Sequence, residues 1–135
     1  MKKLFIPYEP KKTNRWLVKF PEEFEIPEYT LKSITKPKYI SGKWDDVRIT
    51  FNAIANKQLE KGLKKMIYTK GKTNINWTFK FTIEDLDPTG VVIGKWEILV
   101  DEVVSIDFGG ELTYHDDKIQ EIVLIVKPYD CEPII

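Results

Sequence analysis

Apolar and polar side chains alternate along much of this chain, and a period of two residues is the spacing of a β-strand. The clearest case runs from Trp44 to Ala53, where Val47, Ile49 and Phe51 alternate with charged or polar neighbours. Such alternation indicates a sheet with one face packed against the core and the other exposed to solvent. The segments that we expect to form strands are 14–20, 29–34, 44–53, 75–83, 91–100, 103–108, 111–114 and 119–126.

One segment departs from this period. Between Asn56 and Lys70 the apolar residues recur every three or four positions, which is helical spacing. Asn56 suits the N-cap of a helix, and Gly71 suits its end. The narrow apolar stripe predicts a helix that lies against a sheet rather than inside a bundle. The stripe consists of Leu59, Leu63, Met66 and Ile67.

Turn residues separate the expected strands. The run Asp87-Pro88-Thr89-Gly90 favours a type I turn, and Pro21 and Pro128 are expected to end the strands before them. A chain of 135 residues without an internal repeat has the size of one domain. We therefore predict a single domain over residues 1–135, with a flexible arm over residues 1–13. The predicted fold class is mainly β, a β-sandwich or barrel with one flanking α-helix.

Charge is divided unevenly along a chain whose formal net charge is zero. Residues 1–72 hold 17 Lys and Arg against 8 Asp and Glu, whereas residues 73–135 hold 4 against 13. The two halves therefore carry net charges of +9 and −9. Such asymmetry is compatible with a nucleic-acid face. It also fits a contact between the two halves, either within one subunit or between neighbouring subunits.

Few residues are suited to catalysis or metal binding. The single Cys131 excludes an internal disulfide, and the single His115 excludes a histidine-rich metal site. A Cys131–His115 dyad needs a defined electropositive pocket, and we expect Cys131 to be an idle thiol near a mobile terminus. His115-Asp116-Asp117 is expected to be a polar turn rather than a metal site. We predict no catalytic residues, no cofactor, no metal and no enzymatic activity.

Composition and charge also bear on whether the chain binds nucleic acid or a membrane. Basic residues alternate with aromatic ones around Tyr39 and Trp44, as in proteins that bind single-stranded nucleic acid, but the overall pI of about 6.6 argues against such a role. The longest purely aliphatic run, Ile122 to Val126, is far shorter than a bilayer-spanning helix. Pro7 and Glu9 interrupt the apolar start of the chain, so we expect no signal peptide and a cytosolic protein by default.

The order of several segments resembles the tail tube proteins of contractile-tailed bacteriophages, whose fold the tube-forming protein of the type VI secretion system shares. The segment from Asn14 to Phe20 resembles the first strand of that family, and Gly42 to Phe51 resembles the strand that follows its long hairpin. Leu86 to Gly90, six residues before Trp96, resembles the turn and tryptophan-bearing strand of such proteins. The segments 104–114 and 119–129 resemble the closing strand pair.

This resemblance implies a structural virion protein, a ring-forming, hexameric subunit of a tail tube. Its rings stack into a conduit for DNA ejection, and genomic DNA passes through the lumen without sequence-specific binding. Implied partners are further copies of the chain together with sheath and baseplate proteins, with no membrane. The implied location is the virion tail, and the host cytoplasm during assembly. The alternatives are a baseplate tube-initiator, another tail or neck component of the same fold, or a monomeric β-sandwich module that binds a ligand or nucleic acid.

For such a subunit we expect three sets of candidate residues, which line the lumen, form subunit interfaces or anchor the structure. Polar side chains on one strand face are expected to line the lumen or to face bulk solvent, and the basic helix is expected to be available to a sheath. Basic and acidic groups at turns are expected to meet across subunits, and tryptophans are expected to pack in the core or at interfaces. The lumen candidates are Arg48, Thr50 and Asn52. The interface candidates are Lys32, Lys36, Lys38, Lys43, Asp85, Asp87, Asp116 and Asp117, and the structural anchors are Trp16, Trp44, Trp77 and Trp96.

Overall fold

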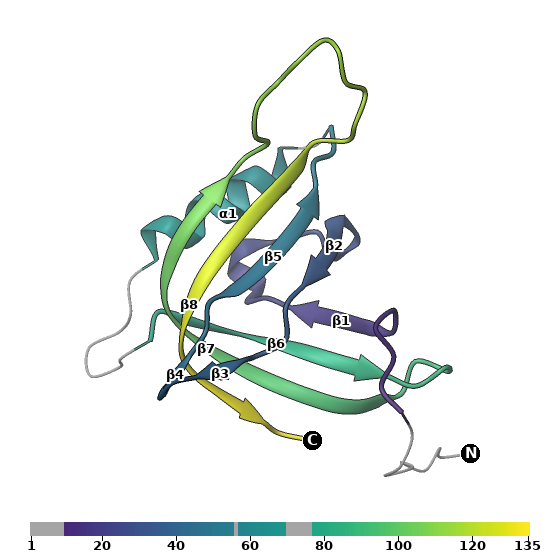
Figure 1. Cartoon of the computed structure of the whole chain (residues 1–135), viewed down its shortest axis with the longest axis vertical. Helices are drawn as coiled ribbons and strands as arrows, with labels where there is room; N and C mark the ends of the chain where they lie inside the picture. The colour runs from purple at the N-terminus through teal and green to yellow at the C-terminus, as the bar shows by residue number, and fades with distance from the viewer. Residues whose placement is uncertain (1–9, 56, 70–76) are drawn as a thin grey trace.

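The computed structural model describes residues 10–55, 57–69 and 77–135. Six antiparallel strands form one sheet in the order β1-β6-β7-β8-β5-β2, and a separate two-stranded hairpin pairs β3 with β4 (Figure 1). The predicted mainly β fold with one flanking helix is confirmed, and its sheet is a curled half-barrel. The strands are β1 Trp16–Lys19, β2 Leu31–Ile34, β3 Tyr39–Ile40, β4 Lys43–Trp44, β5 Val47–Asn52, β6 Phe79–Leu86, β7 Val92–Asp107 and β8 Glu121–Pro133.

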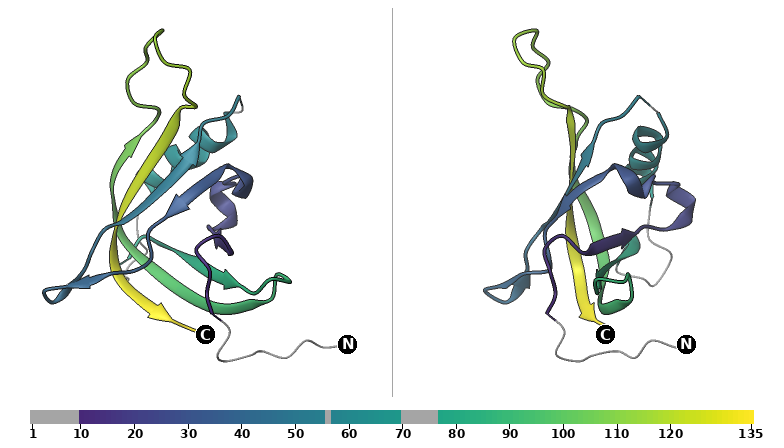
Figure 2. Two further views of the ribbon diagram at one scale, coloured as in Figure 1. Left: turned by 45° about the vertical axis from the view of Figure 1, so that its right-hand side comes forward. Right: turned by 90° about the vertical axis from the view of Figure 1, so that its right-hand side faces the viewer.

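The helix α1, Gln58–Tyr68, lies on the concave side of the sheet beside two short 3₁₀ turns, η1 Glu22–Phe24 and η2 Glu28–Thr30 (Figure 2). Leu59, Leu63 and Met66 are buried, as the helical stripe predicted. Ile67 is about half exposed, so its place in that stripe was wrong. The buried side of α1 includes Gly62 in place of Ile67. Asn56 and Gly71, the expected helix ends, lie outside the described residues, as do the first nine residues of the expected arm.

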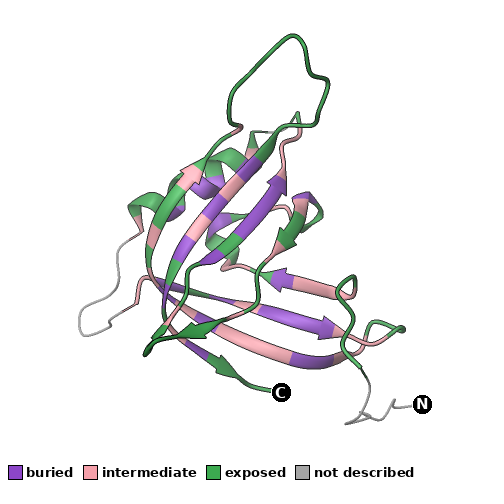
Figure 3. Ribbon diagram, in the orientation of Figure 1, coloured by how far each residue is buried: buried purple, intermediate pink, exposed green. Residues whose placement is uncertain are grey.

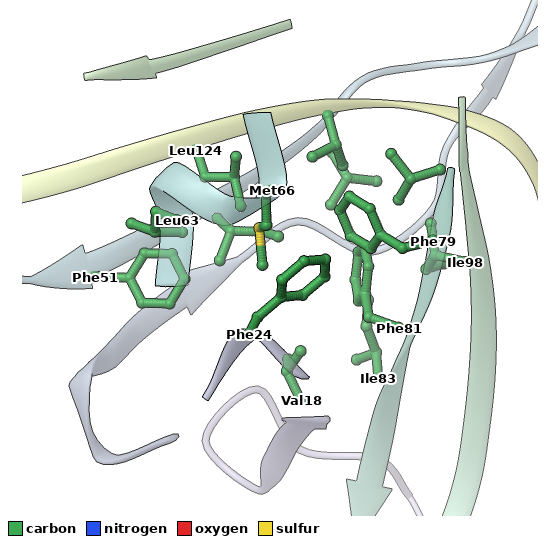
Figure 4. Packing of buried hydrophobic residues seen from close by; sticks show 14 of the residues in the cluster. Val18, Phe24, Phe51, Leu63, Met66, Phe79, Phe81, Ile83, Ile98 and Leu124 are labelled. Carbon is green, nitrogen blue, oxygen red and sulfur yellow. The ribbon is translucent and has the colours of Figure 1, made fainter. Parts of the chain in front are cut away.

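The core fills the space between α1 and the sheet. Figure 4 shows Phe24 beside Phe79, Phe81 and Met66, with Val18 from β1 beneath them. The rings of Phe24 and Phe79 make an edge-to-face contact at 5.2 Å. Aromatic pairs in this geometry add about 0.5–1.5 kcal/mol beyond the area that they bury. The η1 turn therefore holds α1 and the sheet together.

Gly62 allows α1 to pack closely on η1. A Cβ at this position would lie far inside van der Waals contact with the carbonyl oxygen of Phe24, and 2.7 Å from Cδ1 of Ile26. The first of these atoms belongs to the backbone and cannot rotate away. Glycine is thus required by the close approach of the two segments.

The strands of the second half differ from the prediction in length. The segments 91–100 and 103–108 form one 16-residue strand, β7, which three register shifts bend along β8. Residues 111–114 form no strand. Strand β8 does not end at Pro128 but continues to Pro133. Pro128 is tolerated because pairing with β5 stops at Val126, so the missing N–H of Pro128 has no ladder partner to lose on that side.

Candidate assembly surfaces

Two exposed features mark opposite ends of the molecule. The connection between β7 and β8, residues 108–120, extends beyond the sheet at one end (Figure 1), and we call it the projecting loop. The β3–β4 hairpin lies in the other half, and both views of Figure 2 agree on this placement. Figure 3 colours the projecting loop almost entirely as exposed. The chain therefore presents different surfaces at its two ends.

Local hydrogen bonds shape the projecting loop. Oδ1 of Asp107 accepts hydrogen bonds from the backbone N–H of Gly110 at 2.7 Å and of Gly109 at 3.1 Å. These bonds, that from Gly110 first, lower the pKa of Asp107. Gly110 has φ of 70°, a conformation that favours glycine. Further along, Asp116 accepts a hydrogen bond from the N–H of Lys118 at 2.9 Å.

Large apolar side chains stand in solvent on this loop. Leu112, Tyr114 and Ile119 are each at least two-thirds exposed, and Tyr114 is fully so. The loop also carries Glu111 and Asp117, both exposed. An acidic segment with several unburied apolar side chains is typical of a protein–protein contact.

The β3–β4 hairpin is held by Trp44, and exposed charges of both signs flank it: Lys38 and Lys43, and Asp45 and Asp46 directly after β4. The ring of Trp44 contacts Trp96 edge-on at 6.2 Å, and its Nε1 donates to Oδ1 of Asp130 at 3.2 Å. The role of Lys38 and Lys43 in assembly stays a prediction, as does that of Asp116 and Asp117 in the projecting loop.

Lys36 and Asp85, expected on the two sides of a subunit contact, meet within one chain. Lys36 follows β2 and forms an ion pair with Asp85, whose side chain on β6 is only 4% exposed. Lys11 lies on the same carboxylate, with its Nζ 3.9 Å from Oδ2. Gly94 leaves room for this arrangement, since a Cβ there would lie 2.7 Å from Nζ of Lys11. Because Lys36 follows β2, while Asp85 lies on β6 beside β1 at the opposite end of the strand order, the Lys36–Asp85 pair joins the two ends of the curled sheet.

Other ion pairs also connect the basic and acidic halves inside the chain. Nζ of Lys19 lies 3.5 Å from Oε1 of Glu84, and Nζ of Lys32 lies 3.2 Å from Oε2 of Glu121. Within its turn, Oδ1 of Asp87 accepts hydrogen bonds from the backbone N–H groups of Thr89 and Val91 and from the hydroxyl of Thr89. The bond from the N–H of Gly90 to the carbonyl of Asp87 closes the predicted turn. Part of the charge separation along the sequence is thus neutralised within one subunit.

The lumen candidates share the face of β5 that points away from the core. Arg48 is exposed and Asn52 is half-buried, whereas Thr50 is only 7% exposed. Thr50 pairs with Ser33 on one side and Val123 on the other, and these neighbouring strands cover it. Of the three, Arg48 presents the most surface to whatever lies on this side of the sheet.

Three of the four tryptophans pack around the core. Trp16, Trp44 and Trp96 are partly buried against it, while Trp77 is half-buried before β6. A hollow of about 440 Å³ lies on the outer side of α1. It is lined by Lys57, Glu60, Lys61, Lys64, Ile67, Tyr68 and Phe108.

The two residues considered for catalysis lie apart. His115 is exposed in the projecting loop, whereas Cys131 is buried in β8, near the other end of the molecule. The expectation that Cys131 lies on a mobile terminus was wrong, because β8 extends past Pro128 and pairs Cys131 with Ile98. The described part of the chain contains no group of three metal-ligating side chains. Within the same residues, no helix has both the length and the apolar character needed to cross a membrane.

Cys131 is expected to resist thiol reagents in the folded protein. Burial, together with the charge of Asp130, raises the pKa of its thiol from 9.0 to about 12. Reaction with an aromatic disulfide reagent at pH 8 should proceed only after denaturant is added, because the thiolate is the nucleophile. The contribution of this thiol to stability is independent of pH below about 9, and because its pKa is raised by folding, stability falls as pH rises from there toward 12. Rapid labelling of the native chain would contradict the buried placement.

Comparison with known proteins identifies the fold. No protein-family model matches the chain, and no curated protein matches it. A chain of the sheath–tube complex of an extracellular contractile injection system (PVC, extended state) is similar, with a TM-score of 0.65, 12% identity, and 93% of this chain and 92% of that chain covered. A chain in the tube-terminating cap structure of the anti-feeding prophage gives 0.64, at 10% identity and coverages of 98% and 95%. A chain in the six-fold symmetrised baseplate of the anti-feeding prophage gives 0.58, at 12% identity and coverages of 93% and 95%.

Proposed function

We propose that this chain is a structural subunit of a contractile tail, which forms rings that stack into a tail tube. The observation that carries the proposal is the similarity to chains from three contractile injection structures, each matched over more than 90% of both chains. At 10–12% identity this likeness concerns the fold. The step from fold to tube rests on the surfaces of this chain.

The curled sheet is suited to closing into a ring with other copies. Strands β1 and β2 each have a strand neighbour on one side only within the described sheet. An unpaired edge is a template for a strand of another chain. Half-barrels joined edge to edge form a continuous sheet, with α1 on one side and the Arg48 face on the other. In the proposed tube, the Arg48 face lines the lumen and α1 faces a sheath.

The different ends of the molecule suit head-to-tail stacking. Heterologous contacts place one surface of a subunit against a different surface of the next. The acidic projecting loop and the β3–β4 hairpin with its exposed Lys38 and Lys43 are two such surfaces, at opposite ends of the molecule. We propose six copies per ring, a virion tail as the location, and passage of DNA through the lumen without sequence-specific contacts. This role is structural and requires no catalysis.

A second candidate is a component of the same fold at one end of the tube. Two of the similar structures are a baseplate and a tube-terminating cap. A subunit of this kind forms a ring but does not continue into a filament. The two candidates therefore differ in the length of the assembly.

Electron microscopy of the purified chain over a range of concentrations tests the proposal. We expect rings and stacked tubes for a shaft subunit, and single rings for a baseplate or cap component. Because exposed charges contribute at the stacking surfaces, high salt should slow the growth of tubes. Compact monomers at every concentration would contradict the proposal and favour a monomeric binding module.

A further inference from the structure

A cavity opens between the two ends of the curled sheet. It has a volume of about 290 Å³ and is bounded by β1, the end of β2, β6 and the segment before β1. Trp16, Ile34 and Ile83 give it apolar walls. We call it the mouth cavity; its polar residues are Lys11, Lys12, Thr13, Lys36 and Asp85.

The mouth cavity carries net positive charge. Its single carboxylate, Asp85, is buried and already contacts Lys36 and Lys11. Lys12 is exposed on the rim and forms none of the ion pairs found among the described residues. A site with apolar walls and a surplus of ammonium groups suits an apolar side chain that has carboxylates beside it.

The projecting loop has this chemistry. Tyr114 is fully exposed, Leu112 is nearly so, and Asp117 follows three residues after Tyr114. A rigid aromatic side chain that fills a pocket is the typical centre of a protein–protein contact. The loop and the elements that bound the mouth cavity lie in opposite halves of the molecule (Figure 1), so a loop cannot reach the cavity of its own chain.

We infer that the projecting loop of one copy inserts Tyr114 into the mouth cavity of the next copy, with Asp117 beside Lys12. The contact is heterologous, and it repeats from copy to copy without closing. The place of this contact between stacked rings rests on the proposed function. The contact itself can form between any two copies that associate head to tail. The occupant is a second copy of this chain, because the loop supplies both the apolar group and the charge that the cavity lacks.

Disulfide cross-linking of the full chain tests the contact. The double variant Asp117→Cys with Lys12→Cys keeps Tyr114 and should give a ladder of dimers, trimers and longer products under mild oxidation, on a gel run without reductant. A matched control joins Asp117→Cys to Lys64→Cys, which lies on the outer side of α1. We expect the first pair to react at least about tenfold faster, because docking raises the effective concentration of the two thiols. The buried Cys131 remains in both variants.

Reversing the charges of Lys12 and Asp117 provides a second test of the contact. Lys12→Glu should weaken association about tenfold, and adding Asp117→Lys should restore it, as for opposite charges that meet. Lys64→Glu, with the same change of charge elsewhere, should leave association unchanged. No ladder in chains that still form tubes overturns this inference and leaves the tube proposal standing. A ladder without rings or tubes keeps the contact and overturns the tube, and loss of both ladder and assembly overturns both.

Discussion

The variant Gly62→Ala is expected to unfold at least about 10 °C below the native protein. On helix propensity alone, alanine in place of this glycine stabilises by about 1 kcal/mol. Here the added Cβ meets the carbonyl oxygen of Phe24, a backbone atom that moves only if α1 or η1 moves. Overpacking a core typically costs about 1–3 kcal/mol and sometimes more. Because a rigid atom is involved, we expect a net loss above about 3 kcal/mol, measured by thermal and urea denaturation.

Two companion variants separate the backbone clash from other causes. Lys61→Ala changes the neighbouring helical residue, which is exposed, and should leave the melting temperature within a few degrees of the native value. Ile26→Val shortens the side chain that lies nearest to the new Cβ. It should fail to rescue Gly62→Ala, since the contact with Phe24 persists. A more stable Gly62→Ala variant would mean that propensity outweighs packing at this site.

The alternation of apolar residues was sufficient to predict the strands that have one face in the core. Val47, Ile49 and Phe51 follow it without exception, and all are buried. The pattern does not specify what covers the opposite face. The alternation predicts that Thr50 is exposed to solvent, yet its neighbours on β2 and β8 bury it. Periodicity therefore predicted the sheet but not the exposure of its outer side.

Local signals failed where tertiary pairing overrides them. Pro128 was expected to end a strand, but it lies where β8 has no β5 neighbour and where the register of its pairing with β7 shifts at Val100. Ile67 has the spacing of the apolar stripe, but the close contact at Gly62 rotates the buried face of α1 toward η1. The isolated glycine inside the helix was the available signal for this contact. Sequence alone gave no sign of the partner segment.

The charge pattern was informative about contacts but not about their partners. A surplus of lysines in one half and of carboxylates in the other predicted that the two would meet. Several do so inside one chain, through Lys36 with Asp85 and Lys32 with Glu121. Which residue points inward depends on the curl of the sheet, which brings the end of β2 across to β6. Composition holds no information about that curvature.

Lys36 and Lys38, two residues apart in the sequence, are expected to give opposite results on reversal to glutamate. Lys36→Glu places a carboxylate beside the buried Asp85, which also loses the nearer of its ion-pair partners and keeps the more distant Lys11. Removing one partner from a buried pair typically costs about 3–5 kcal/mol, and because Lys36 is partly exposed we expect the lower end of this range. Urea denaturation should show a clearly lower midpoint, and poor assembly of this variant will reflect a weakened subunit.

Lys38→Glu changes an exposed side chain directly before the β3–β4 hairpin and should alter stability by no more than about 0.5 kcal/mol. If the hairpin meets an acidic surface of the next ring, this variant slows tube growth at low salt, and the difference from the native chain disappears in 1 M salt. Light scattering during assembly measures the rate, and Lys36→Met serves as the control that removes charge beside Asp85 without reversing it. Equal stability of the two glutamate variants, with equally slow assembly, would contradict the internal role of Lys36 and place both lysines at the subunit contact.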